Sequence, residues 1–346
     1  MMTQEAVKNY KRKIALRNMW IVIGGALLLI SIFFISMNIG YSKLSILDAL
    51  NTIIGKGTEN QELILFQYRL PRIVISVLIG AGLSLSGCII QGISRNPLAE
   101  PGLLGINAGA GLMAILYALL LGITNFLSVF TLPFLALIGA AAAAVAVYFL
   151  AYKKQEGISS DRLVLTGIAV QAGISALTTV LIVSLDDMKF SIVAGWQAGQ
   201  IWGANWQYVL ALLPWLCALI PYVLFKAKSL DVLNLGDEVA IALGMSVERE
   251  RRNLFAISVM LAACCVGVGG NISFVGLIAP HLARRLVGPK HRILLPVCAL
   301  TGAVLVCVAD TLGRILIQPS SIPTGIMTSI IGAPYFIYLL TKSKQQ

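Results

Sequence analysis

Long uncharged apolar runs recur along the chain, and the charged residues gather between them. The run 19–38 (MWIVIGGALLLISIFFISMN) carries no charge. At about 1.5 Å per residue, a helix of that length spans the hydrocarbon core of a bilayer, which is about 30 Å thick. The runs lack the alternation of half-buried elements in soluble domains. The pattern therefore predicts a polytopic membrane protein.

The runs predict ten transmembrane helices in a single domain over 1–346, so the expected fold class is an all-α integral membrane protein. The predicted spans are 19–38, 73–93, 103–122, 128–151, 162–184, 206–225, 253–270, 272–287, 293–312 and 323–341. Residues 1–18 precede them as a tail. We expect no cleaved signal peptide, because the first span is longer than a signal core and no small-residue cleavage site follows it.

Composition and charge agree with this interpretation. Hydrophobic residues make up 58% of the chain and charged residues only 12%, about half the share in soluble domains. The net charge of +11 suggests nucleic acid at first sight, but most of the 26 Lys and Arg residues fall in alternate connecting segments. The positive-inside rule then places both termini in the cytoplasm of a bacterial cell. The charge therefore predicts contact with membrane lipid and no nucleic-acid partner.

A weak internal repeat divides the chain. The glycine and proline positions of one block, Gly87, Pro97 and Gly105, recur with the same spacing in a later block as Gly270, Pro280 and Gly288. The two blocks enter the membrane from opposite sides, which predicts inverted halves of five helices each, at about 69–184 and 252–341. Inverted repeats are typical of transporters. Chance is the alternative, because Gly and Pro are common in membrane helices.

One cytoplasmic loop, 226–252, contains the polar island NLGDEVAIALG (234–244). Gly236 lets the chain turn, and Asp237 and Glu238 suit the positive N-terminal end of a short helix. Gly244 suits a left-handed cap at its other end. Residues 239–243 would expose an apolar face to water, which indicates a protein partner. A helix lying on lipid is the alternative, although acidic residues disfavour an anionic inner membrane surface.

The chain lacks the signatures of an independent energy source. It has no Walker sequence, no H-E-x-x-H and no G-x-S-x-G. The span interiors hold almost no ionisable residue apart from Asp310, whereas ion-coupled carriers keep acidic or histidine relays there. A transporter of this kind needs energy from another chain. An ion-coupled secondary carrier and a membrane enzyme are therefore the less favoured alternatives.

The chain resembles the permease subunits of ATP-binding-cassette (ABC) importers for iron-siderophores, haem and cobalamin, which are type II importers. Six blocks carry the resemblance: RLPRIVISVLIGAGLSLSGCIIQG (69–92), RNPLAEPGLLGINAGAG (95–111), LNLGDEVAIALG (233–244), ISFVGLIAPHLARRLVGPKHRILLP (272–296), ADTLGR (309–314) and IPTGIMTSIIGAPYFIYLL (322–340).

The resemblance implies a non-enzymatic transport subunit for ferric siderophore, with haem or cobalamin as alternatives. Its implied partners are an ATPase dimer, an extracytoplasmic substrate-binding lipoprotein and a second permease, identical or homologous. ATP and Mg belong to the ATPase, and no cofactor is expected on this chain. The island would be the coupling helix seated on the ATPase, through Gly236, Asp237, Glu238, Ala240, Leu243 and Gly244.

The resemblance also implies two further sites. Arg69 and Arg314 match the arginines that receive glutamates of the binding protein. The alternative is that these and the other outer cations, Arg72 and Lys43, pair with lipid phosphates or with Asp310. Ser160 and Asp161 match the cytoplasmic gate, although an acidic residue departs from the family's small hydroxyl residues. An ordinary N-cap of the helix at 162–184 is the alternative there.

Three tryptophans lie in an outer segment: Trp196, Trp202 and Trp206. Anchoring of the indole rings at the membrane interface is the favoured interpretation, and contact with cargo is the alternative.

Overall fold

The computed structural model describes residues 4–40, 45–120, 128–153, 160–201, 205–318 and 320–343, and most of these residues are helical. Within this part of the chain, ten helices have 13 or more residues: α1 (Gln4–Asn38), α4 (Leu70–Ser94), α5 (Ile106–Leu120), α6 (Ser128–Ala151), α7 (Ser160–Ile182), α9 (Trp206–Phe225), α12 (Val247–Gly269), α13 (Val275–Val287), α14 (His291–Leu316) and α15 (Thr324–Ser343). Shorter segments connect them: α2 (Ile46–Ile53), α3 (Glu59–Glu62), the π-helical η1 (Leu63–Arg69), the 3-10 helix η2 (Pro101–Leu104), α8 (Asp187–Gln197), α10 (Ala227–Leu233) and α11 (Asp237–Ala242).

Each predicted span overlaps one of the ten longer helices, but not all of these helices have the length of a full crossing. Seven described helices are long and apolar enough to cross a membrane, and the apolar parts of α5 and α15 are shorter. Helix α13 has 13 residues, or about 20 Å. Ten complete crossings therefore stay a prediction. The predicted tail is helical from Gln4 and continuous with the first span in α1; its position in the cytoplasm stays a prediction.

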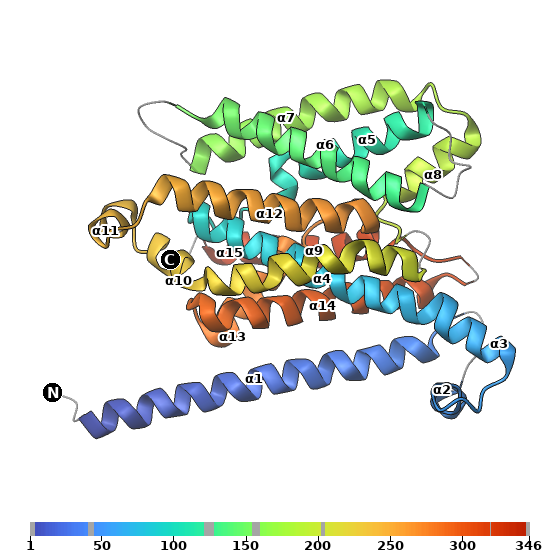
Figure 1. Ribbon diagram of the computed structural model, residues 1–346, viewed down its shortest axis with the longest axis horizontal. Helices are drawn as coiled ribbons and strands as arrows, with labels where there is room; N and C mark the ends of the chain where they lie inside the picture. Colours follow the sequence, from blue (N-terminus) through green and yellow to red (C-terminus); the bar gives the residue numbers. More distant parts are fainter. Residues whose placement is uncertain are drawn as a thin grey trace.

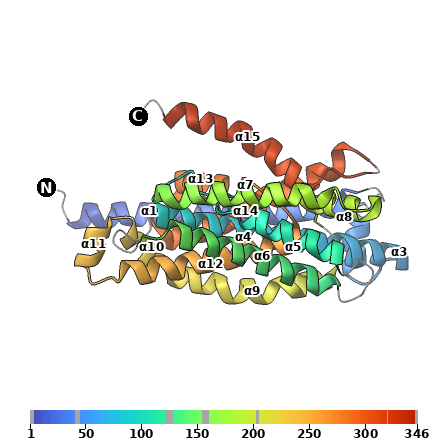
Figure 2. The same cartoon turned by 90° about the horizontal axis from the view of Figure 1, so that it is seen from above.

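The longer helices lie side by side along the long axis of the molecule (Figure 1). Helix α4 is central and packs against α9, α12, α13 and α14. Helices α5, α6 and α7 form one flank, and α1 runs along the opposite one (Figure 1). Both termini lie at the same end as α10 and α11, whereas α2, α3 and α8 lie at the other end. Figure 2 shows α15 diverging from the bundle toward its C-terminal end.

Glycines allow the central helices to approach each other closely. A Cβ atom on Gly80 of α4 would overlap the backbone of Gly302 in α14, and one on Gly87 would overlap the carbonyl group of Gly276 in α13. Lipid is as apolar as leucine, so helices in a membrane gain stability from close packing more than from leaving water. Small residues at the crossings are therefore what holds this bundle together.

The spacing of the sequence repeat does not align the observed helices, and the expected equivalence of two prolines is wrong. Pro97 lies in the turn after α4, whereas Pro280 lies inside α13. If α4 is matched with α12 and α6 with α14, the number of residues between the two starts differs from one pair to the other. The starts of α6 and α14 are closer together in the sequence than those of α4 and α12. Connecting segments of different length in the two parts of the chain explain the failure of any single offset.

The order of helix lengths nevertheless recurs. Helices α4, α5, α6 and α7 have 25, 15, 24 and 23 residues, and α12, α13, α14 and α15 have 23, 13, 26 and 20. A long helix and two short helices precede each series. Helices α1, α2 and α3 precede the first series, and α9, α10 and α11 precede the second. Helix α4 starts at the end that holds α3, whereas α12 starts at the end that holds α11 (Figure 1).

We expect Gly87→Ala to lower the melting temperature of the detergent-solubilised protein, because the new methyl group would force α4 and α13 apart. Overpacking of this kind costs about 1–3 kcal/mol. Gly24→Ala is the matched control, since a Cβ there meets no atom within 4 Å and alanine favours a helix by about 1 kcal/mol over glycine. Equal melting temperatures for the two variants in scanning fluorimetry would contradict the close crossing.

Candidate functional site

The polar island at 234–244 folds as predicted into a short helix, α11, at the end of the molecule that holds both termini (Figure 1). Gly236 precedes it with φ +113° and Gly244 follows it with φ +82°, a region of backbone conformation that favours glycine. The N–H of Gly244 donates to the carbonyl of Ile241 at 2.8 Å, and that of Met245 donates to Ala240 at 3.0 Å. These two bonds form a Schellman cap.

Helix α11 has one buried side and one exposed apolar side. Ala240 is fully buried in the main core, and Glu238 is exposed. Large apolar side chains of the island point outward, with exposed fractions from 44% to 64%: Leu235, Val239, Ile241 and Leu243. Such a patch beside charged residues at the end of a membrane protein marks a surface for a protein partner or for lipid.

Asp237 attaches α11 to the bundle. Its carboxylate pairs with Arg95, the residue that caps α4 with φ +51°, and with Arg251 of α12 at 2.9 Å. Arg95 also donates to the carbonyl of Leu233 at 3.0 Å. The sequence placed Asp237 in the predicted coupling helix but assigned no role to Arg95. The partners of Arg95 are far from it in the sequence and reach it only because the C-terminal end of α4 lies beside α10 and α11 in the fold.

At the opposite end of the bundle, Asp310 of α14 is the centre of an arginine cluster. The Asp310 carboxylate pairs with Arg72 of α4 at 2.9 Å and with Arg314 at 3.1 Å, and it accepts a hydrogen bond from Thr324 at 2.9 Å. The side chain of Asp310 is 1% exposed. A buried carboxylate needs such partners, because an isolated charge in an apolar environment is strongly unfavourable.

The two predicted docking arginines lie in this same cluster, and both bind the C-terminal end of α1. Arg69 donates to the carbonyl of Met37, and Arg314 donates to that of Ile39 at 2.8 Å. Helix ends leave carbonyls without helical partners, so these guanidinium groups complete α1. Arg69 is only 6% exposed. Pairing with Asp310, the alternative interpretation, is therefore what Arg72 and Arg314 do in this structure, and the docking role stays a prediction.

The predicted gate cannot be placed at the level of side chains. Helix α7 begins at Ser160, but the side chains of Ser160 and Asp161 lie outside the described part of the structure, as do Lys43 and Trp202. The gate therefore also stays a prediction.

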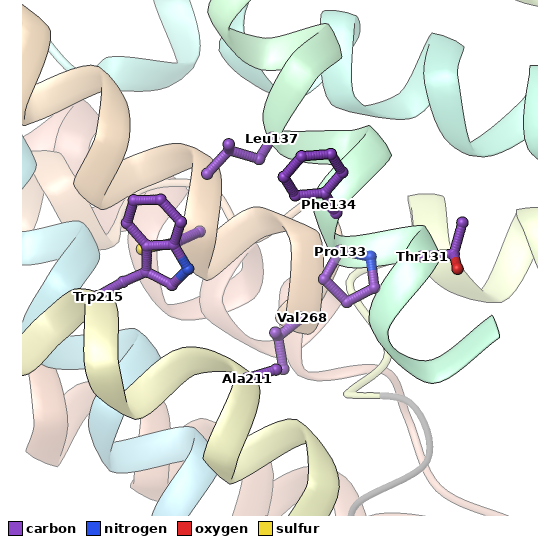
Figure 3. A pocket seen from close by; sticks show the side chains of 8 residues that line it. Thr131, Pro133, Phe134, Leu137, Ala211, Trp215 and Val268 are labelled. Atoms are coloured by element: carbon purple, nitrogen blue, oxygen red, sulfur yellow. The ribbon is translucent and has the colours of Figure 1, made fainter. Parts of the chain in front are cut away.

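A large open pocket of about 370 Å³ lies between α6, α9 and α12. Figure 3 shows Phe134 and Pro133 of α6 facing Trp215 and Ala211 of α9, with Val268 of α12 beside them. No charged residue is among those that line it. The pocket has the chemistry of a contact with acyl chains, and it offers nothing to orient a polar ligand.

A second pocket, of about 240 Å³, is polar. The turn before η2, α5, α7, α8 and the segment 270–274 meet there, and the polar side chains that line it are Glu100, Asn107, Gln171, Ser175, Thr178, Thr179, Gln197, Asn271 and Ser273. The Asn107 amide donates to the side-chain oxygen of Asn271 at 2.7 Å. Polar side chains from five segments thus converge on one cavity in a largely apolar chain.

Glu100 is the titratable group of this polar pocket. Burial raises the pKa of its carboxyl to about 7, and the hydrogen bond from the Phe274 backbone acts in the opposite direction. Phe274 itself has φ +68°, which is uncommon for a residue other than glycine. The sequence placed Glu100 in a connecting segment between two spans and assigned it no role.

Trp196 lines the same polar pocket and is 3% exposed. The predicted anchoring at the membrane interface is therefore wrong for this tryptophan, because α8 packs against α5 and the indole ring is covered by that contact. Trp206 does remain partly exposed, at 36%, and donates to the carbonyl of Phe66 at 2.8 Å. The indole N–H of Trp196 and the hydroxyl of Thr178 are buried and have no hydrogen-bond partner among the described residues.

Comparison with protein-family models matches residues 27–342 to the FecCD transport family. The chain belongs to the FecCD transport family. The match covers both the arginine cluster and α11, and it agrees with the resemblance found in the sequence blocks.

Two curated FecCD-type relatives and one solved structure cover nearly the whole chain. The iron(3+)-hydroxamate import system permease protein FhuG of Bacillus subtilis is 48% identical over 92% of this chain and 95% of its own length. The Fe(3+)-citrate import system permease protein YfmE of the same organism is 43% identical over 91% and 92%. An inward-facing structure of a metal-chelate type ABC transporter matches with a TM-score of 0.81 and 32% identity, over 94% of this chain and 99% of that chain.

These matches establish the class of the molecule. The chain is a helical membrane permease of the kind found in ABC importers, and the family assigns it no catalytic step of its own. The resemblance stated from the sequence is confirmed.

Proposed function

We propose that this chain is the permease subunit of an importer for ferric siderophore complexes, driven by ATP that a separate subunit hydrolyses. The observation that carries the proposal is the 48% identity, over nearly the full length of both chains, to a permease named for iron(3+)-hydroxamate import. The apolar face of α11 at the end that holds both termini supports dependence on a partner, and that end is cytoplasmic in the proposed orientation.

Growth under iron limitation tests this function. A strain that lacks the gene should fail to grow on its siderophore and recover when the wild-type chain is returned, but not when the ATPase subunit is also deleted. Haem, cobalamin and ferric citrate serve as parallel arms of the panel. Uptake that persists without the ATPase and depends on a proton or sodium gradient would instead support an ion-coupled carrier.

The surface that would receive the ATPase is the exposed side of α11, defined above by Leu235, Val239, Ile241 and Leu243. An amphipathic helix that presents apolar anchors to a groove is a recurring mode of recognition. The pairs of Asp237 with Arg95 and Arg251 hold the base of α11, so a push on this helix would be passed to α4 and α12. This geometry supports coupling better than lipid contact, because the helix projects beyond the end of the bundle (Figure 1).

We expect Ile241→Asp to abolish cargo-stimulated ATPase activity of the assembled complex while the permease still inserts in the membrane. The side chain is 63% exposed, so the substitution places a charge in the interface and not in the core. Ile241→Val is the matched control, and Gly236→Pro should uncouple as well because proline cannot adopt φ +113°. Wild-type stimulation in Ile241→Asp would show that α11 is not the coupling element.

The proposed assembly contains a second permease and two inverted five-helix halves within each chain. The recurring order of helix lengths and the opposite directions of α4 and α12 support the halves. The divergence of α15 from the bundle (Figure 2) supports a second chain, because the bundle itself leaves much of that helix uncovered. In this arrangement Ser160 and Asp161, at the start of α7, would form the cytoplasmic gate.

Docking of an extracytoplasmic binding protein is proposed at the arginine cluster. Arg72 and Arg314 share the carboxylate of Asp310, and Arg69 lies close enough to Arg314 for their charges to interact, so these four side chains taken together are positively charged. Such a field attracts an acidic surface and raises the rate of encounter. Because the guanidinium groups already bind α1 and Asp310, a partner's glutamates would have to compete with those contacts at the edge of the cluster.

We expect Arg69→Gln and Arg314→Gln to weaken binding-protein association at least tenfold each, since truncating a partly buried charged pair costs about 2–5 kcal/mol. Raised salt should weaken the wild-type complex as well. Lys56→Gln, an exposed cation in the same outer region, is the control and should change little. An affinity that neither salt nor either arginine substitution alters would leave the cluster as an internal brace for α1.

A further inference from the structure

Helices α1 and α14 run side by side in the same direction and in a constant register. A Cβ atom on Gly25 would lie 3.6 Å from the side chain of Leu300, and the Thr311 hydroxyl donates to that of Ser36 at 3.0 Å. The residues of each pair are 275 apart in the sequence. Because both helices rise by the same amount per residue, this offset places the first turn of α14 level with residues 16–19 of α1, at the end that holds both termini (Figure 1).

Exposed cations gather at this level of the bundle. Arg17 lies on α1, and Arg292 is its counterpart in the first turn of α14. Arg285 is in the last turn of α13, and Lys290 is the N-cap residue of α14. All four side chains are exposed, and we call these four residues the basic rim. Helix α1 packs against both α13 and α14, so the helix ends that carry the basic rim are neighbours.

The segments that carry the basic rim contain no carboxylate to neutralise it. The sequence has no Asp or Glu between Glu5 and Asp48, and none between Glu250 and Asp310. Within the described part of the chain, no member of the basic rim forms an ion pair. Other cations at this end are paired, as Lys226 is with Glu250 at 2.7 Å. A cluster of cations without counter-charges attracts anions from outside the chain.

Apolar neighbours place the basic rim at the surface of the bilayer. Trp20 is 66% exposed and lies three residues after Arg17 on α1, and Leu286 is 48% exposed directly after Arg285. Tryptophan is enriched at membrane–water interfaces, and basic side chains near helix ends extend from there toward the headgroups. A phospholipid offers a phosphate to the cations and acyl chains to Trp20 and Leu286, whereas a free anion would leave these apolar side chains in water.

We propose that the basic rim binds the headgroups of anionic phospholipids in the membrane leaflet at the α11 end of the bundle. Guanidinium and ammonium groups donate to phosphate oxygens, and guanidinium can do so through two parallel hydrogen bonds. One lipid layer would thus contact α1, α13 and α14 together and hold α1, whose apolar window is only 6% buried, against the bundle. The inference is independent of the cargo. An acidic surface of a protein subunit is the alternative occupant.

Titration of the detergent-solubilised full chain with phosphatidylglycerol tests the proposal. Native mass spectrometry measures the bound lipid, and phosphatidylcholine with the same acyl chains is the uncharged comparison. We expect the wild type to bind phosphatidylglycerol more tightly. Arg17→Gln combined with Arg292→Gln should weaken that binding about 25-fold, at about fivefold for each cation near an anionic headgroup. Binding of phosphatidylcholine should not change.

Arg249→Gln is the matched control. Arg249 is also an exposed arginine at this end of the bundle, but it lies in α12 between Glu248 and Glu250, and its loss should leave the affinity for phosphatidylglycerol unchanged. Arg17→Lys combined with Arg292→Lys keeps both charges and should retain most of the affinity. The melting temperature of every variant in phosphatidylcholine is measured by scanning fluorimetry, so that loss of folding is not read as loss of lipid binding.

Equal affinities of the wild type for the two lipids would overturn the proposal. An equal loss in Arg249→Gln would also overturn it, because the effect would then come from the overall charge of this end. Normal phosphatidylglycerol binding in the double glutamine variant, together with loss of ATPase-subunit binding, would assign the basic rim to a protein partner instead. Failure of the wild-type complex to import any ferric chelate, with lipid binding as expected, would refute only the proposed function.

Discussion

Close packing around α4 is the constraint on which the rest of this structure depends. Within a bilayer, helices gain little from leaving lipid, so the bundle must be held by dispersion contacts at short range. Helix α4 meets α14 at Gly80, α12 and α9 at Gly82 and α13 at Gly87. Because α4 is fixed along its whole length, the arginines at its two ends, Arg72 and Arg95, are held at a constant separation.

The ends of α4 thereby connect the two surfaces at which partners are proposed to bind. Arg72 pairs with Asp310 at the end that holds α3, and Arg95 pairs with Asp237 at the end that holds α11. A helix of 25 residues is about 37 Å long. A rigid helix of that length can pass a displacement between the binding-protein side and the ATPase side without any ionisable relay inside the membrane. This proposed mechanical link agrees with the scarcity of charged residues in the spans, since it needs no charge inside the membrane.

The sequence predicted the elements whose signals are local. Apolar runs located the longer helices, because a run of about 20 apolar residues has few alternatives to a membrane helix. The glycines and acidic residues of 234–244 predicted α11 and its caps, because those preferences act within a few residues of the chain. Family resemblance supplied the class of protein, and the comparisons confirmed it.

What the sequence could not predict depends on contacts between distant segments. The pairing of Arg95 with Asp237 joins residues 142 apart, and the burial of Trp196 follows from the path of the chain around α8. Glu100 looked like a connecting residue because the chain there is polar and contains proline. The repeat offset failed for a similar reason. Spacing along the sequence includes the connecting segments, whereas structural equivalence is set by helix order and direction.

Helices α1 and α7 pack little against the rest of the chain. The apolar windows of α1 and α7 are each 6% buried. The exposed residues of α1 include Leu27, Leu28 and Ile30, whose branched side chains suit acyl chains. Helix α7 also exposes Gly173, Ser175 and Thr179. Hydroxyl groups and a bare glycine gain nothing from lipid, whereas water or a second helix surface can satisfy them. Helix α7 exposes large apolar side chains as well, among them Leu177 and Val180, and α1 exposes Gly24 and Ser31. The low burial therefore shows that both helices face surroundings outside this chain, and each offers those surroundings both apolar and small polar contacts.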